Sequence, residues 1–218
     1  MKKQGYIYLI VACVLLALFV ALTVCLVFVD VRAAGESGAE VGFATINEKV
    51  WQTIGQSEAA LTVSEICGLC MIAAVGAFGV VGLVQVIRRK GILRADRELY
   101  VMAGGLVLLA VAYVFFEIFV INCRPVLDEG ELAASFPSSH TMLAVAVAGM
   151  GASYLHSRPK KGVLLGVLVG LLTGIAICTV ACRLLGGVHW PTDIVGGVLL
   201  GMAILYVCRA VCSLTARE

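Results

Sequence analysis

Six hydrophobic segments constrain the fold of this chain more than any other feature of its sequence. Each is between 16 and 24 residues long, and an α-helix needs about 20 apolar residues to cross the hydrocarbon core of a bilayer. With 61% hydrophobic and only 14% charged residues, the composition excludes an ordinary soluble domain. We expect an all-α, polytopic membrane protein, with one domain over residues 1–218. Its six transmembrane helices are expected at Tyr6–Val29, Glu65–Ile87, Leu99–Asn122, Thr141–His156, Val163–Leu184 and Ile194–Ala210.

The basic residues predict the orientation of this bundle. Those that flank the spans all fall on one side of a six-span alternation: Lys2, Lys3, the run Arg88–Arg97, the run Arg158–Lys161, Arg209 and Arg217. Because positive charge is enriched in cytoplasmic loops, both termini are expected in the cytoplasm of a multi-pass cell-membrane protein. The first hydrophobic segment is longer than the core of a signal peptide, so we expect it to be retained.

The opposite, extracytoplasmic side receives the loop of residues 31–64 and the two connections that precede His140 and Asp193. Within the loop, Phe43–Leu61 carries apolar residues at helical spacing, which predicts an amphipathic helix on the membrane surface. This helix is interpreted either as a lid or as a connector, and we favour the connector.

Three polar clusters on this outer side interrupt the apolar pattern. They are Glu117–Pro125, Pro137–His140 and Cys182–Asp193. Arginine near hydrocarbon is costly and usually functional, and the guanidinium groups of Arg124 and Arg183 offer planar forks of donors that suit phosphate oxygens. The turn that starts at Pro137 enters a helix, whose first free N–H groups and positive dipole end favour an anion. The clusters therefore predict a phosphate site beside the bilayer.

Two histidines and an aspartate supply a reaction for that site. Asp193 follows His189 by four residues, and a carboxylate that holds one ring nitrogen leaves the other free as a nucleophile. His140 has an ordinary pKa of about 6.5, so it can donate a proton to a leaving oxygen. The predicted mechanism is phosphoryl transfer through a phosphohistidine, followed by attack of water.

These clusters resemble the three motifs of the type 2 phosphatidic acid phosphatase (PAP2) superfamily, in order and over the whole chain. The resemblance implies a nucleophilic His189, Asp193 as its partner and His140 as general acid. It implies phosphate binding by Arg124, Arg183, Ser138 and the backbone at Ser139. It also implies chemistry without a metal or other cofactor.

Three positions depart from the pattern of the superfamily. Ser139 replaces a usual glycine, Cys182 replaces a serine, and Glu117 replaces the lysine that begins the first motif. Seven residues are about two helical turns, or roughly 10 Å of rise, so Glu117 is expected on the face of Arg124 and deeper in the membrane. There it is expected to repel a dianion, to be protonated by burial, to brace Arg124 or Arg183, to cap a hydrogen-bond network, or to tune the choice of substrate or of transfer chemistry.

Glycine and cysteine spacing gives further expectations. Gly162, Gly166, Gly170 and Gly174 form a stripe on the fifth span, and Gly197 and Gly201 repeat the spacing on the sixth; both predict close helix contact within the bundle. Seven of the nine cysteines are interpreted as packing residues. Cys123 and Cys182 each precede a motif arginine, which leaves a disulfide between them open.

The first hypothesis is an outward-facing lipid phosphatase. Its substrate is expected to be a membrane lipid: a polyprenyl pyrophosphate such as undecaprenyl pyrophosphate, phosphatidic acid or phosphatidylglycerophosphate. One alternative passes the phosphoryl group to another lipid or glycan, and another is a non-catalytic protein that binds or transports a phospholipid. The bilayer is the expected partner, a nucleic acid is not, and the sequence leaves the oligomeric state open.

Overall fold

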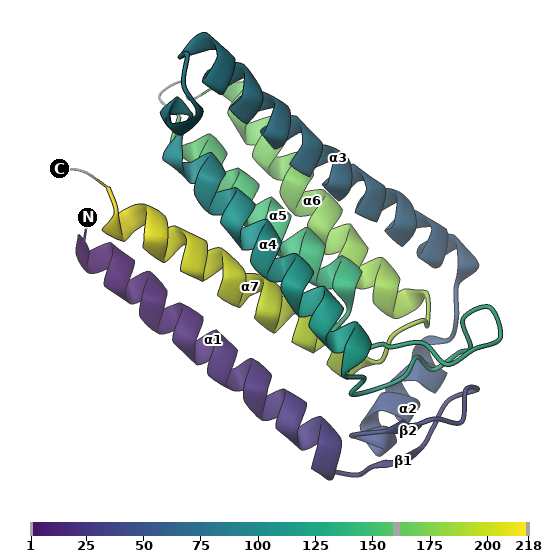
Figure 1. Ribbon diagram of the computed structural model, residues 1–218. Coiled ribbons are helices and arrows are strands. Elements are labelled where there is room, and N and C mark those ends of the chain that lie inside the picture. The colour runs from purple at the N-terminus through teal and green to yellow at the C-terminus, as the bar shows by residue number, and fades with distance from the viewer. Residues whose placement is uncertain (1, 159–161, 217–218) are drawn as a thin grey trace.

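The computed structural model describes residues 2–158 and 162–216, and its architecture is helical (Figure 1). The all-α prediction is confirmed. The basic residues Lys160, Lys161 and Arg217 lie outside the described residues. The helices are α1 (Lys2–Phe28), α2 (Ala44–Ile54), α3 (Glu58–Arg88), α4 (Arg97–Ile118), α5 (Ser139–His156), α6 (Val163–Leu185) and α7 (Pro191–Leu214), with a short 3-10 helix at Ile92–Arg94 and two short strands, β1 (Arg32–Ala33) and β2 (Glu40–Val41).

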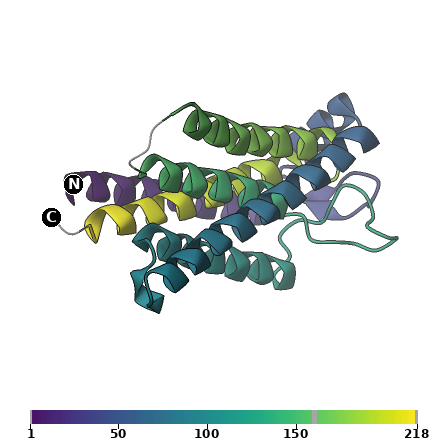
Figure 2. The same cartoon turned by 90° about the horizontal axis from the view of Figure 1, so that it is seen from above.

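The helices form a bundle with two different ends (Figures 1 and 2). Both views place the two ends of the described chain together, and we call this the basal end. The opposite end, which we call the site end, gathers α2, the two strands and the long segment between α4 and α5. The predicted outer connections therefore do meet on one side of the bundle.

Five helices within the described residues are long and apolar enough to cross a membrane: α1, α3, α4, α6 and α7. α5 has 18 residues and contacts α3, α4, α6 and α7. Because α5 packs against four other helices, it tolerates polar residues at both of its ends. The sixth span therefore stays a prediction.

Of the helix boundaries that differ from the sequence prediction, two bear most directly on the site. α3 begins at Glu58 and not at Glu65, because the Ser57 hydroxyl accepts a hydrogen bond from the backbone N–H of Ala60 and caps the helix at 3.2 Å. The predicted outer loop of residues 31–64 is shortened accordingly. α4 ends at Ile118, so the apolar residues up to Ile121 belong to the non-helical segment of the site end.

Close contact between α5 and α7 positions the site. A Cβ atom on Gly197 would lie 2.8 Å from the Ser138 carbonyl oxygen, and one on Gly201 would lie 2.8 Å from that of Met142. Only glycine allows this approach, so the predicted role of these two residues is confirmed. As a result, the backbone N–H of Ser138 reaches the carbonyl oxygen of Asp193 at 3.0 Å.

The glycine stripe of α6 does not bring another helix close, and the prediction of close contact there is wrong. A Cβ atom on Gly162, Gly166, Gly170 or Gly174 would find no other described heavy atom within 4 Å. α6 contacts α3 and α5 through other faces. Spacing alone identifies a face of a helix, but it does not identify what covers that face.

The predicted amphipathic helix is present as α2, and it is fixed to the connection between α6 and α7. The indole N–H of Trp51 donates to the Gly187 carbonyl at 2.8 Å, and its ring lies 6.1 Å from that of Trp190. Asn47 is fully buried and donates to the hydroxyl of Thr192 at 3.0 Å. These contacts agree with the connector interpretation.

Candidate active site

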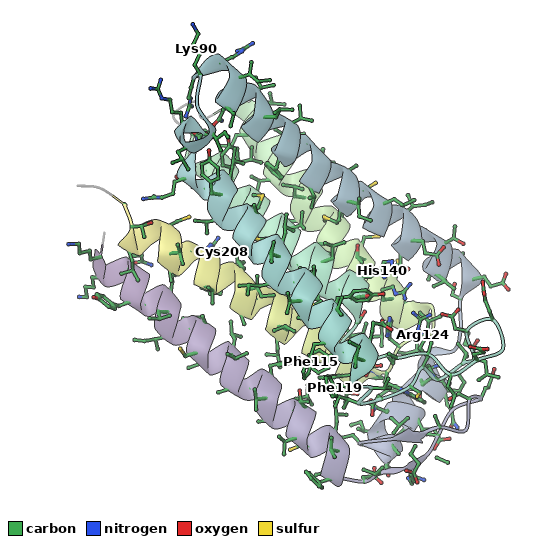
Figure 3. The ribbon with its side chains drawn as sticks, viewed as in Figure 1. Lys90, Phe115, Phe119, Arg124, His140 and Cys208 are labelled. Carbon is green, nitrogen blue, oxygen red and sulfur yellow. The ribbon has the colours of Figure 1, made fainter. Side chains whose placement is uncertain are left out.

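The three polar clusters converge at the site end. Arg183 comes from the last turn of α6, His189 from the following connection, and Asp193 from the first turn of α7. Ser138 and His140 stand at the start of α5. Arg124 comes from the segment between α4 and α5, and Figure 3 shows it at the same end of the bundle as His140. All the predicted site residues thus lie at one end.

A chain of hydrogen bonds runs through His189, which is 3% exposed. The Nη2 of Arg183 lies 3.0 Å from Nε2 of His189, and the Nδ1 of the same ring lies 3.0 Å from the Ser135 hydroxyl. That hydroxyl donates a short hydrogen bond to the carboxylate of Asp193. Because the Ser135 hydroxyl gives its proton to Asp193, it accepts from Nδ1–H of His189. This tautomer leaves the Nε2 lone pair for reaction.

The expected direct contact between His189 and Asp193 is therefore replaced by a relay. Nδ1 of His189 lies 3.8 Å from Oδ2 of Asp193, which is too long for a hydrogen bond. The sequence prediction missed Ser135, because its two contacts span 54 and 58 residues of sequence. The only signal was its place two residues before Pro137, at the edge of the second cluster.

The carboxylate of Asp193 is fully buried and held by other donors. The backbone N–H of Trp190 donates to it at 2.9 Å, so Asp193 also caps the start of α7. The side-chain amide of Asn122 approaches its other oxygen at 3.4 Å. Asn122 in turn accepts a hydrogen bond from the backbone N–H of Gly42 at 3.2 Å, so the segment before α2 supports the donor to Asp193.

Several buried donors at the site have no hydrogen-bond partner among the described residues. They are the Nε atoms of Arg124 and Arg183 and the hydroxyls of Ser138 and Thr141. A buried donor without a partner costs about 1–3 kcal/mol. An anion bound between Arg124, Arg183 and Ser138 would satisfy the donors of these three residues, in agreement with the predicted phosphate-binding role.

Burial and neighbouring charge affect both histidines. Burial lowers the pKa of His189 below its ordinary value; the nearby carboxylate of Asp193 opposes this shift, and the charge of Arg183 adds to it. His140 lies outside the fourth predicted span, which begins at the next residue, Thr141. Burial, followed by the charges of Arg183, His189 and Arg124, lowers its pKa to about 4. The general-acid role of His140 therefore requires a bound anion that offsets these positive charges.

Glu117 lies at the rim of the site cavity without a polar partner in the part of the chain that the structure describes. Arg124 pairs with Asp128 at 2.8 Å and not with Glu117, and Glu117 is exposed. These contacts give no support to the predicted bracing of an arginine or to the predicted hydrogen-bond cap, and both stay as predictions. The prediction that Glu117 and Arg124 lie on one face of a helix is wrong, because α4 ends at Ile118 and Arg124 lies beyond it. Repulsion of a dianion, protonation and a tuning role stay as predictions.

The cavity at this site has a volume of about 20 Å³, which holds about one water molecule. A phosphoryl group can enter only if side chains move, and Arg183 is the group that covers Nε2 of His189. Cys123 and Cys182 are free thiols, so the disulfide left open by the sequence is not formed. Within residues 2–158 and 162–216, no three His, Cys, Asp or Glu side chains gather as a metal site would require.

Comparison with known proteins agrees with this geometry. Residues 70–214, which include all three clusters, match the family described as the PAP2 superfamily. The search among curated proteins gave no match. The chain is similar to the crystal structure of the first transmembrane PAP2 type phosphatidylglycerolphosphate phosphatase from Bacillus subtilis. The TM-score is 0.69 and the identity 17%, over 94% of this chain and 98% of that one. At this identity the likeness establishes the fold.

Proposed function

The chain belongs to the PAP2 superfamily, and from that membership we propose that it is an integral membrane lipid phosphatase. It hydrolyses a lipid phosphate or pyrophosphate at the extracytoplasmic face, and the predicted span Thr141–His156, which is the part of α5 beyond His140, completes a set of six. The relay from Arg183 through His189 and Ser135 to Asp193 carries this proposal. It combines a buried imidazole, a fixed tautomer and a cation at the reactive nitrogen, which is what a phosphohistidine mechanism requires.

In the first step, the phosphoryl group displaces Arg183 from the lone pair at Nε2 of His189. Arg183 and Arg124 then bind its oxygens, together with the Ser138 hydroxyl and the backbone N–H of Ser139. Nε2 attacks phosphorus, so a P–N bond forms and the P–O bond to the lipid breaks. His140 gives its proton to the leaving oxygen. The resulting phosphohistidine is held by the same donors.

In the second step, His140 accepts a proton from water, and the water oxygen attacks phosphorus. The P–N bond breaks, inorganic phosphate leaves, and His189 returns to its starting tautomer. Through both steps Ser135 keeps its hydrogen bond with Nδ1 of His189. Its other hydrogen bond, to Asp193, connects the ring to the negative charge of that carboxylate. The two histidines therefore have different roles because only His189 is connected to a buried carboxylate.

Tyr113 and Phe116 of α4 line the same cavity as His189, which supports entry of the lipid from the bilayer beside α4. Polyprenyl pyrophosphate, phosphatidic acid and phosphatidylglycerophosphate remain the candidates, and the name of the similar Bacillus subtilis protein adds support for the last of them. The test is phosphate release by purified protein in detergent on this panel, with products identified by mass spectrometry. Free phosphate and dephosphorylated lipid support hydrolysis. A phosphorylated acceptor indicates transfer, and lipid binding without any product indicates a non-catalytic protein.

The pH dependence should separate the roles of the two histidines. The lowered pKa values of His189 and His140 predict an optimum of kcat/KM below pH 6.5, the ordinary histidine value, since His189 must be neutral and His140 protonated. The profile of kcat should extend to higher pH, because bound phosphate offsets the charges around His140. His140→Ala should remove the decline on the basic side, while ionisation of the substrate affects both proteins equally. An alkaline optimum of kcat/KM in the wild type would contradict this assignment.

Glu117→Lys tests whether the glutamate only repels the substrate. Replacing a negative charge at the rim by a positive one should raise kcat/KM about threefold to tenfold on every anionic lipid of the panel, or about 0.7–1.4 kcal/mol. Glu48→Lys on α2 is the matched control, because Glu48 is a half-buried glutamate at the same end and lies outside the cavity. Loss of activity, or a changed order of substrates, would instead make Glu117 part of the mechanism.

A further inference from the structure

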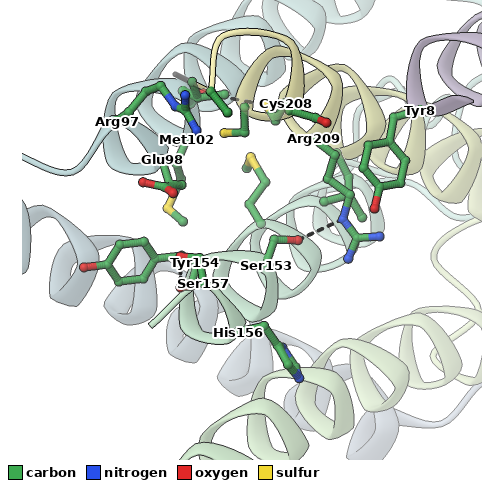
Figure 4. A pocket seen from close by; sticks show the side chains of 16 residues that line it. Tyr8, Arg97, Glu98, Met102, Ser153, Tyr154, His156, Ser157, Cys208 and Arg209 are labelled. Carbon is green, nitrogen blue, oxygen red and sulfur yellow. Dashed lines mark hydrogen bonds between the residues drawn. The ribbon is translucent and has the colours of Figure 1, made fainter. Parts of the chain in front are cut away.

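A second cavity, unrelated to the motif residues, opens at the basal end (Figure 4). Its volume is about 380 Å³, within the range usual for small-molecule sites, whereas the cavity at His189 holds about 20 Å³. Side chains from α1, α4, α5 and α7 line it. Both its size and its distance along the bundle separate it from the phosphatase site.

Two arginines from different helices stand at this cavity, Arg97 of α4 and Arg209 of α7 (Figure 4). Arg209 donates through Nε to the Ser153 hydroxyl at 2.9 Å and lies 5.9 Å from the Tyr8 ring. The Nε of Arg97 is buried and has no hydrogen-bond partner among the described residues. Neither guanidinium forms an ion pair with a carboxylate in the described parts of the chain. Among the residues that the structure describes, the cavity thus holds two arginines that form no ion pair.

The nearby carboxylates are already neutralised by other cations. Glu98 lines the cavity, but Arg158 approaches it at 3.4 Å. Asp96 pairs with Arg89 at 3.0 Å and also accepts a short hydrogen bond from Arg158. An internal ion-pair network therefore does not explain Arg97 and Arg209. Among the described residues, positive charge therefore remains in excess around the cavity, with Arg97 and Arg209 facing each other across it (Figure 4).

The rest of the wall is apolar. Met102, Met150 and Leu205 line the cavity, and each side chain is almost fully buried. A pair of guanidinium groups beside such a wall is suited to a ligand with an anionic head and a hydrocarbon part. Because Arg97 lies at the start of α4 and Arg209 near the end of α7, the guanidinium groups lie where helix ends meet lipid headgroups.

We propose that this basal cavity binds a phosphate-bearing anion between Arg97 and Arg209. Two sources offer this chemistry: the headgroup of an anionic phospholipid and free inorganic phosphate. The apolar wall favours the phospholipid. The site lies at the opposite end of the bundle from His189, so its occupant is a different molecule from the lipid that the phosphatase site processes.

The test is a titration of the full-length protein in neutral detergent, followed by native mass spectrometry. The probes are short-chain phosphatidylglycerol, short-chain phosphatidylcholine and inorganic phosphate. Arg97→Gln combined with Arg209→Gln should weaken phosphatidylglycerol binding at least about tenfold, since each charge-assisted hydrogen bond contributes about 1.5–3 kcal/mol. Binding of the zwitterionic phosphatidylcholine should not change. If inorganic phosphate alone shows the arginine-dependent binding, the source is the free anion.

The matched control is Arg88→Gln combined with Lys90→Gln, which removes the same charge from exposed residues at the same end. Equal weakening in this control would overturn the proposal, as would unchanged affinity in the arginine double variant for both phosphatidylglycerol and phosphate. Arg97→Gln alone provides a second variant if the double variant fails to fold, because its Nε has no partner to lose. Phosphate release in neutral detergent reports on the fold of each variant.

Discussion

Replacing His189 by alanine is expected to lower phosphate release by roughly four orders of magnitude or more, the scale on which removal of a nucleophile acts in a triad. The imidazole is buried, its tautomer is fixed through Ser135, and its Nε2 is the nitrogen that faces a cation. No neighbouring group can replace it, because His140 lacks a carboxylate partner and carries the opposite role. Release of inorganic phosphate from a lipid substrate in detergent measures the effect.

The matched control is His156→Ala, since His156 is exposed at the basal end and its Nδ1 lies 2.8 Å from the Ala152 carbonyl. This variant should retain wild-type turnover. A second readout is the phosphoenzyme itself: acid-quenched wild-type protein should carry an acid-labile phosphate that His189→Ala lacks. Wild-type phosphate release by His189→Ala would remove the basis of the proposed function.

The sequence predicts the bundle well because span length and hydropathy are local properties. The fifth predicted span, Val163–Leu184, differs from α6 by one residue. Boundaries at the site end were less predictable, because they depend on contacts. The apolar run of α4 continues past Ile118, but the chain leaves the helix there and carries Asn122 and Arg124 to the ends of α6 and α7. Hydropathy does not register this change of direction.

In the candidate site, too, contacts between residues close in sequence were predictable, and contacts between distant segments were not. His189 and Asp193 are four residues apart, so their proximity follows from the chain itself. Ser135 reaches them from a different segment, and nothing in its spacing indicates the contact. The glycines make the same point: the Gly197–Gly201 pair on α7 and the stripe on α6 have the same four-residue spacing, yet of the two sets only the pair on α7 meets another helix. Which residue touches which partner depends on the assembled bundle.

Asp193→Asn is expected to lower kcat/KM by about 10³ to 10⁴-fold, as loss of the orienting carboxylate does in a triad. The amide keeps the shape of the side chain but removes its charge. It also meets two donors, the Ser135 hydroxyl and the Trp190 N–H, with one oxygen fewer. The His189 tautomer with a free Nε2 is then no longer favoured. Asp30→Asn, an exposed change at the site end, is the control and should alter kcat/KM less than about twofold, within the usual effect of a surface substitution.

A double-mutant cycle tests whether Ser135 transmits the effect of Asp193. Ser135→Ala alone should lower kcat/KM about tenfold to hundredfold, because Nδ1 of His189 loses its acceptor. If the two residues act in series, adding Ser135→Ala to Asp193→Asn should cost little more, since the connection to the ring is already broken. Losses that multiply would mean that Asp193 reaches His189 without Ser135. That result would restore the direct contact expected from the sequence and would require His189 to move toward Asp193 when the substrate binds.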